Sequence, residues 1–268
     1  MSGGMVLDTT QYGLGAVSGL LVGFTLGLVG GGGSILAVPL MVYLVGVRDP
    51  HVAIGTSALA VAANAATGLI SHARARCVKW RCGGVYAAAG IIGALLGSTL
   101  GKTVNGQQLL FLFALLMIGI GVMMLRSRNN TGLAEAQCNR ENAPKVIGFG
   151  FGTGVFSGFF GIGGGFLIVP GLIASTGMPI LNAVGTSLVA VSAFGLTTAV
   201  NYAFSGMVDW TLAVVFIAGG VVGGAGGAAA ARRLSADRGR LATVFAGLIF
   251  VVAIYMLWRS GGALMHAA

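Results

Sequence analysis

The stretch Gly27-Leu-Val-Gly-Gly-Gly-Gly-Ser-Ile-Leu-Ala-Val-Pro39 interrupts an apolar region with four consecutive glycines. A second stretch, Gly158-Phe-Phe-Gly-Ile-Gly-Gly-Gly-Phe-Leu-Ile-Val-Pro170, repeats the pattern 131 positions later. The apolar segments that follow the breaks, at about 34–47 and 165–177, are shorter than the roughly 20 helical residues that cross a bilayer. The sequence therefore predicts two helical hairpins that are broken at glycine or re-enter the membrane.

A duplication extends beyond these hairpins. The sequence Ala53-Ile-Gly-Thr-Ser57 recurs as Ala183-Val-Gly-Thr-Ser187, 130 positions later. Further matches at the same offset pair Thr67 with Thr197, Trp80 with Trp210, Gly93 with Gly223 and Gly97 with Gly227. We therefore divide the chain into a first transmembrane repeat at 1–125, a linker at 126–145 and a second repeat at 146–268.

The composition is typical of a protein that lies in lipid. Of the 268 residues, 56% are hydrophobic and only 8% are charged, whereas a soluble domain carries about 25% charged residues. The 48 glycines show no collagen period, and small residues suit close helix packing in a membrane. We expect an all-α, polytopic transmembrane bundle with apolar segments at about 12–30, 34–47, 52–71, 83–101, 107–125, 147–161, 165–177, 183–202, 211–230 and 241–258.

The basic residues indicate the orientation. Three regions, 72–82, 126–145 and 231–240, carry 12 of the 15 Lys and Arg residues, and the positive-inside rule places them in the cytoplasm. The repeat equivalents of these loops change sides, because basic 72–82 corresponds to 203–210, which has no Lys or Arg. The pattern predicts inverted-topology repeats in the cell inner membrane, with both termini outside the cytoplasm.

The glycine breaks are the candidate binding site. A new helix starts near Ser34 and near Gly165, and the free N–H groups and dipole of a helix start favour an anion. Hydroxyls at the start of the following helices can also donate to an anion, although they can equally bond back to their own helix. The glycines, in turn, can serve packing alone. The candidate substrate-binding residues are Gly30, Gly31, Gly32, Gly33, Ser34, Thr56, Ser57, Gly161, Gly163, Gly164, Gly165, Thr186 and Ser187.

Ionisable residues are missing from the apolar segments. All six Asp and Glu residues fall in predicted tails or loops, and so do the basic residues. A neutral site of amides, hydroxyls and dipoles suits a small anion, and it lacks the carboxylates typical of proton relays. No motif indicates an enzyme, a cofactor or a nucleic-acid partner. His72, Cys77 and Cys82 share one loop, but their spacing matches no compact zinc pattern, so no metal is expected.

A paired motif in this chain resembles the sulfite exporter TauE/SafE family. Its first copy is Gly27-x-x-Gly30-x-Gly32-Gly33 running into Val38-Pro39, followed by Gly55-Thr-Ser57. Its second copy runs from Gly158 to Pro170 and is followed by Gly185-Thr-Ser187. The resemblance covers about 12–258. It implies an inner-membrane permease of about eight helices that exports sulfite or an organosulfonate such as sulfoacetate. The two tips differ, because Gly31 and Ser34 correspond to Ile162 and Gly165.

The leading hypothesis is a permease that exports a small anion, with small shifts of one half against the other exposing the site alternately. An anion channel with the same site is one alternative. A non-transporting membrane scaffold, in which the glycine ridges serve assembly, is another. The lipid bilayer and a small anionic substrate are the expected partners, and a homo-oligomer is possible.

Overall fold

The computed structural model describes residues 8–126, 142–233, 247 and 249–260, and this part of the chain contains helices and turns but no strand. The first half consists of α1 (Thr9–Val29), a 3₁₀ segment η1 (Gly30–Leu36), the short α2 (Ala37–Pro39), a π-helical segment η2 (Leu40–Val45), α3 (Pro50–Arg74), α4 (Trp80–Thr103) and α5 (Gly106–Arg126).

The second half repeats this order with α6 (Ala143–Phe160), α7 (Gly165–Thr176), α8 (Ile180–Phe204) and α9 (Trp210–Arg233). A final helix spans Ile249–Ser260. Each predicted apolar segment overlaps one helical stretch, and the start of the segment predicted at 241–258 lies outside the described residues. Five of the described helices are long and apolar enough to cross a membrane, namely α1, α3, α4, α8 and α9. The prediction of an all-α membrane bundle is therefore confirmed.

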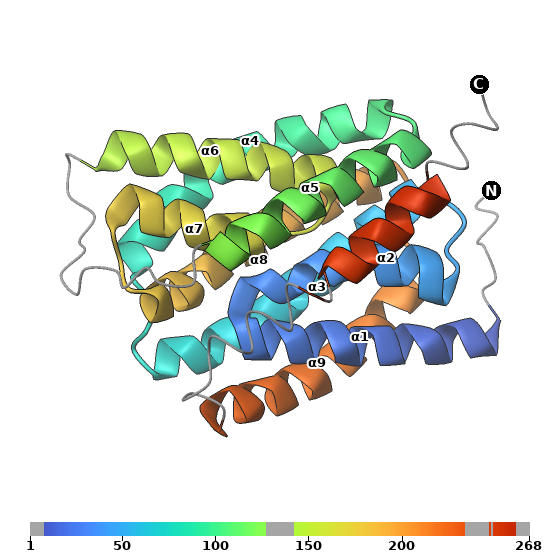
Figure 1. Ribbon diagram of the computed structural model, residues 1–268, viewed down its shortest axis with the longest axis horizontal. Helices are drawn as coiled ribbons and strands as arrows, with labels where there is room; N and C mark the ends of the chain where they lie inside the picture. Colours follow the sequence, from blue (N-terminus) through green and yellow to red (C-terminus); the bar gives the residue numbers. More distant parts are fainter. Residues whose placement is uncertain (1–7, 127–141, 234–246, 248, 261–268) are drawn as a thin grey trace.

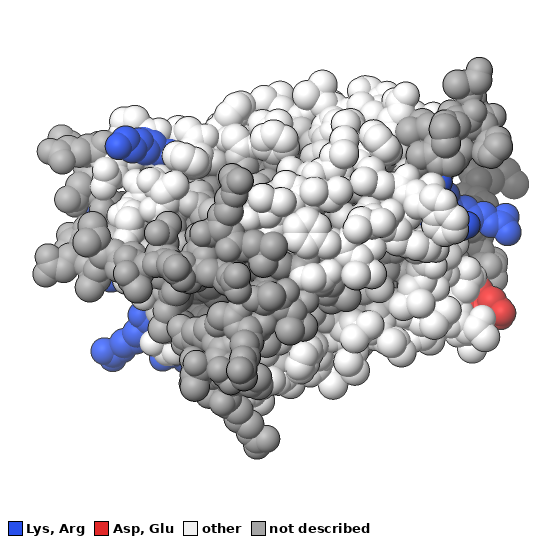
Figure 2. All heavy atoms as spheres, in the orientation of Figure 1, with Lys and Arg blue, Asp and Glu red and all other residues white. Residues whose placement is uncertain are grey.

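The packing of α4 shows why lipid is the solvent. All its glycines except Gly84 are buried, including Gly93 and Gly97, whereas Ile92, Leu96 and Leu100 are more than half exposed. This distribution is the reverse of a soluble helix, in which large apolar side chains turn inward. Figure 2 shows the same property on one face, where the described surface between the charged residues at the two ends is uncharged.

Glycine ridges hold helices from opposite halves together. Gly19 of α1 lies against the backbone carbonyl of Phe216 in α9, and its repeat equivalent Gly150 of α6 lies against that of Tyr86 in α4. A Cβ at Gly19 would overlap the carbonyl it faces. Small residues permit this close approach of backbones in membranes. The α1–α9 and α4–α6 crossings are thus two copies of one contact, each formed between the halves.

The repeats are inverted. In Figure 1, α1 runs from the end near the chain's N-terminus toward the opposite end, and its equivalent α6 runs the other way. The loop from α3 to α4 and the start of α6 lie at the same end of the bundle. That end carries Arg74, Arg76, Lys79, Arg81 and Lys145, with no acidic residue among the described residues there.

Candidate glycine-tip transport site

The second hairpin turns on glycines in the left-handed region. Gly161 ends α6 with φ of +67°, Gly163 and Gly164 both have φ of +64°, and α7 begins at Gly165. Other residues adopt these values only with strain, so this tip requires its glycines. The first hairpin breaks differently, because Gly30–Leu36 continues from α1 as a tighter 3₁₀ helix. The chemical difference between the two tips thus accompanies a different backbone path.

The hairpins meet inside the bundle, since α7 packs against η1. The second tip enters between the central helices α3 and α8. A Cβ at Gly163 would lie 2.9 Å from Cγ1 of Val61 in α3 and 3.2 Å from Cγ1 of Val191 in α8. Gly161 faces Ile54 of α3 in the same way. Gly163 therefore occupies the seam between the two central helices, one from each half.

The first tip packs against α1 of its own half and against α7 and α8 of the other half. Gly33 is buried, and a Cβ there would overlap the α1 backbone at Thr25 and Leu26. Ser34, the next residue, is fully buried. The backbone of Gly30, Gly31 and Gly32 follows the 3₁₀ segment. The structure thus brings the predicted residues of both tips toward the α7–η1 contact.

The predicted threonines have partners across the repeat boundary. The Thr56 hydroxyl accepts a hydrogen bond of 2.9 Å from the N–H of Asp209, which precedes α9. Its equivalent, the Thr186 hydroxyl, accepts one of 2.9 Å from the N–H of Lys79, which precedes α4. Both threonine side chains are fully buried. Each therefore ties the start of a helix in one half to the core of the other half.

The predicted serines bond to their own helices. The hydroxyl of Ser57 donates to the carbonyl of Ile54 at 3.0 Å, and that of Ser187 donates to the carbonyl of Val184 at 2.8 Å. Such back-bonding is the second of the two roles expected for these residues. A role of these four hydroxyls in substrate binding stays a prediction. The two serines would have to release their own helix carbonyls, whereas the two threonine hydroxyls accept their present bonds and can still donate a proton.

Sequence reasoning missed Ser157. This α6 residue is fully buried, its hydroxyl has no hydrogen-bond partner, and it lies against Gly164 at the second tip. The signal that could have found it is the repeat itself, because the aligned position of the first half is Leu26. A polar residue in one copy only, next to the motif, marks a place where the halves differ chemically.

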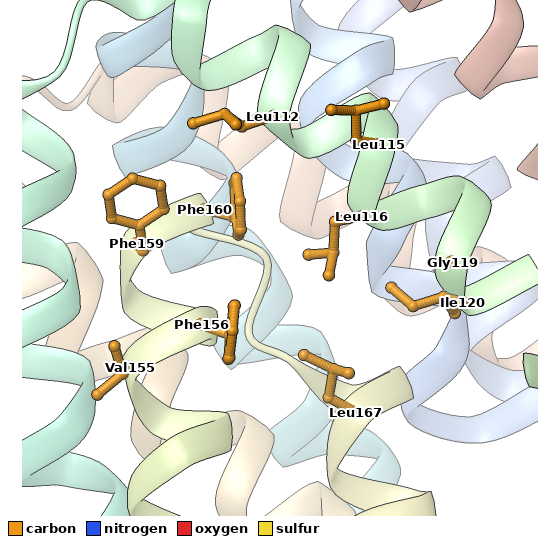
Figure 3. Close-up of a pocket in the computed structure, with 10 residues that line it drawn as sticks. All are labelled: Leu112, Leu115, Leu116, Gly119, Ile120, Val155, Phe156, Phe159, Phe160 and Leu167. Atoms are coloured by element: carbon orange, nitrogen blue, oxygen red, sulfur yellow. The ribbon is translucent and has the colours of Figure 1, made fainter.

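The described residues also form an apolar pocket of about 730 Å³ between α5, α6 and α7. Figure 3 shows its side chains on both sides of the second tip, which runs as a loop between Phe160 and Leu167. Its lining offers no charged or hydroxyl-bearing side chain to bind an anion. Among the described residues, no group of three His, Cys, Asp or Glu side chains is placed to hold a metal. The lining residues are Leu112, Leu115, Leu116, Gly119, Ile120, Val155, Phe156, Phe159, Phe160 and Leu167.

Comparison with known proteins assigns the family. The model of the "Sulfite exporter TauE/SafE" family matches residues 15–256. A "probable membrane transporter protein" of Xylella fastidiosa (strain 9a5c) is 52% identical over 254 residues, which cover 92% of this chain and 95% of the relative. The "probable membrane transporter protein YunE" of Bacillus subtilis (strain 168) is 28% identical over 76% of this chain and 82% of the relative. No solved structure gave a significant match. The chain belongs to the sulfite exporter TauE/SafE family of membrane transporters.

Proposed function

We propose that this transporter exports a small anion, sulfite or an organosulfonate such as sulfoacetate, through a neutral site at the hairpin tips. The observation that carries the proposal is the chemistry of the interior. Every buried polar side chain in the described residues is a hydroxyl or an amide, and no Asp, Glu, Lys, Arg or His is among them. Helix starts and hydroxyls in such surroundings favour an anion over a cation.

The proposed binding residues are those of the tips, from Gly30 to Ser34 and from Gly161 to Gly165. Thr56, Ser57, Thr186 and Ser187 flank these tips and are the second set of candidates. A neutral site holds an anion less tightly than one with Lys or Arg would, and weak binding lets the ion leave as well as enter. Transporters with inverted repeats bind substrate where discontinuous helices meet, which is the arrangement of η1 and α7 here.

The charge asymmetry supports an orientation. The end with Arg74, Arg76 and Lys79 has no described acidic residue, whereas the opposite end combines Arg48 and Lys102 with Asp8, Asp49 and Asp209. The positive-inside rule then places the basic end in the cytoplasm and both chain termini outside, with the inner membrane as the location. A negative interior drives an anion outward by about 2.3 kcal/mol per charge per 100 mV, so export needs no coupling ion.

Flux measurements in proteoliposomes test the proposal. Radiolabelled sulfite, sulfoacetate, sulfate and taurine would be followed separately at set membrane potentials, with protein-free liposomes as the control. The proposal expects saturable, potential-dependent movement of sulfite or sulfoacetate. Flux that rises linearly with concentration would indicate a channel instead. Folded protein that moves no anion would refute the transport of anions and leave the scaffold hypothesis.

A further inference from the structure

We propose that Ser157, together with the first turn of α7, forms the oxyanion-binding part of the transport site. The inference rests on the proposed function and deepens it, because it assigns the substrate's oxygens to one tip and to a residue outside the glycine motif. The ligand class is an anion with several oxygens on one centre, such as sulfite or the sulfonate group of sulfoacetate.

The first observation is the state of the Ser157 hydroxyl. The side chain is 0% exposed and the oxygen has no hydrogen-bond partner. The tip-flanking serines behave otherwise, because Ser57 and Ser187 both bond back to their own helices. A buried hydroxyl without a partner costs about 1–3 kcal/mol, so such groups are rare in folded proteins. A ligand that accepts from this hydroxyl removes that cost.

The second observation is the adjoining start of α7. Its N-cap is Gly164, which has no side chain to cap the helix. The N–H groups of Leu167 and Ile168 bond to the Gly164 carbonyl, but those of Gly165 and Phe166 find no acceptor among the described residues. Both residues are buried. Two amide donors and the positive end of the helix dipole therefore point at one place.

The hydroxyl and the helix start lie together. A Cβ at Gly164 would be 3.0 Å from the Ser157 Oγ and 2.8 Å from its Cβ. Because the N-cap is glycine, no side chain separates the serine from the start of α7. The 12 residues of α7 also give its N-terminus a positive dipole end that attracts an anion. Three donors at one tip suit the several oxygens of a pyramidal or tetrahedral group better than a single-atom halide, so binding of oxyanions is expected to be the stronger.

The first half lacks this arrangement. Its equivalent of Ser157 is Leu26, which is apolar and packs against Gly33. The first tip also passes into a 3₁₀ segment instead of starting a new helix after left-handed residues. One oxyanion site, in the second half, is therefore expected for each chain. The carboxyl end of α6 brings carbonyl oxygens to the same tip, so a sodium ion is the rival ligand to exclude.

Titration calorimetry on the full chain in lipid nanodiscs tests the assignment. Sodium sulfite and sodium sulfoacetate are the probes, and sodium chloride controls for the cation. Loss of one charge-assisted hydrogen bond is expected to weaken sulfite binding about 10-fold or more in Ser157→Ala. The variant should fold normally, because its hydroxyl bonds to no protein group. Ser175→Ala is the matched control, since this buried hydroxyl bonds to the Leu172 carbonyl in its own helix at 3.3 Å.

The possible outcomes distinguish failure of the Ser157 oxyanion site from failure of anion transport itself. Weakened binding in Ser157→Ala, with Ser175→Ala unchanged and the thermal midpoint of both retained, supports the site. Equal sulfite affinity in wild type and Ser157→Ala overturns the inference and leaves anion transport standing. No binding of either anion to folded wild type overturns both. Heat from sodium chloride equal to that from sodium sulfite assigns the tip to a cation or halide and also overturns the inference.

Discussion

Replacing Thr56 and Thr186 by Val tests whether these buried hydroxyls join the two halves. Valine keeps the shape of threonine but removes the acceptor for the N–H groups of Asp209 and Lys79. An N–H group left without a partner costs about 1–3 kcal/mol when buried. Both bonds are only partly buried, so we expect the lower end, about 1 kcal/mol for each substitution.

The two sites lie at the starts of α3 and α8 and share no partner, so their effects should add. The double variant should lose about 2 kcal/mol. A loss of 1 kcal/mol shifts the midpoint by about 2–4 °C in a chain of this size class, so the expected decrease is about 4–8 °C. Thermal unfolding in detergent, followed by tryptophan fluorescence, measures it, and Thr→Ser at both positions is the control that retains the hydroxyls.

The result that would refute this reasoning is specific. If the Thr→Val variants keep the wild-type midpoint yet lose anion flux, the hydroxyls contribute little to stability and act on the substrate. A lowered midpoint with the substrate concentration for half-maximal flux unchanged supports a structural role. The Ser controls must retain the wild-type midpoint, because their hydroxyls can still accept the same backbone hydrogen bonds.

Three further predictions concern packing and polarity in the bundle. Gly93→Ala should lower the free energy of unfolding by about 1–3 kcal/mol, because the new Cβ would overlap a backbone carbonyl of α6. Gly148→Ala is the control, since a Cβ there meets open space, and it should leave the thermal midpoint unchanged or raise it. Asn64→Leu should raise the unfolding midpoint, because both buried amide atoms lack partners; a lowered midpoint would show that the amide is satisfied. Lys102→Met should lower the unfolding midpoint by a few degrees, because Lys102 donates to the carbonyl and side-chain oxygens of Asn201 at the end of α8. Lys102→Arg should retain part of this hydrogen bonding. Equal midpoints for wild type, Lys102→Met and Lys102→Arg would contradict a stabilising role of Lys102.

Much of the fold follows from local sequence signals, whereas the site depends on contacts between distant segments. The glycine runs and the positions of Lys and Arg are local, and the repeat offset requires only a comparison of the sequence with itself. Together they predicted the helical segments and the inversion. The partner of Thr56 could not be predicted, because it lies 153 positions away and meets the hydroxyl only after the halves pack. The state of Ser157 is equally non-local, since a free hydroxyl differs from a back-bonded one only in its surroundings.

The glycine crossings also constrain how the transporter can move. Because α1 packs on α9 and α4 packs on α6 with backbones in contact, sliding one sequence repeat against the other would break both crossings. Helix α3 packs against α9 and α1, α8 packs against α4 and α6, and α3 and α8 pack extensively against each other in the centre of the bundle. Gly163 touches Val61 of α3 and Val191 of α8, so the second tip lies between these two central helices. Rocking about the α3–α8 contact would leave the α1–α9 and α4–α6 crossings intact, although it would shift Gly195 of α8 against the Ala58 carbonyl of α3. The half-against-half shift expected from the duplication stays a prediction.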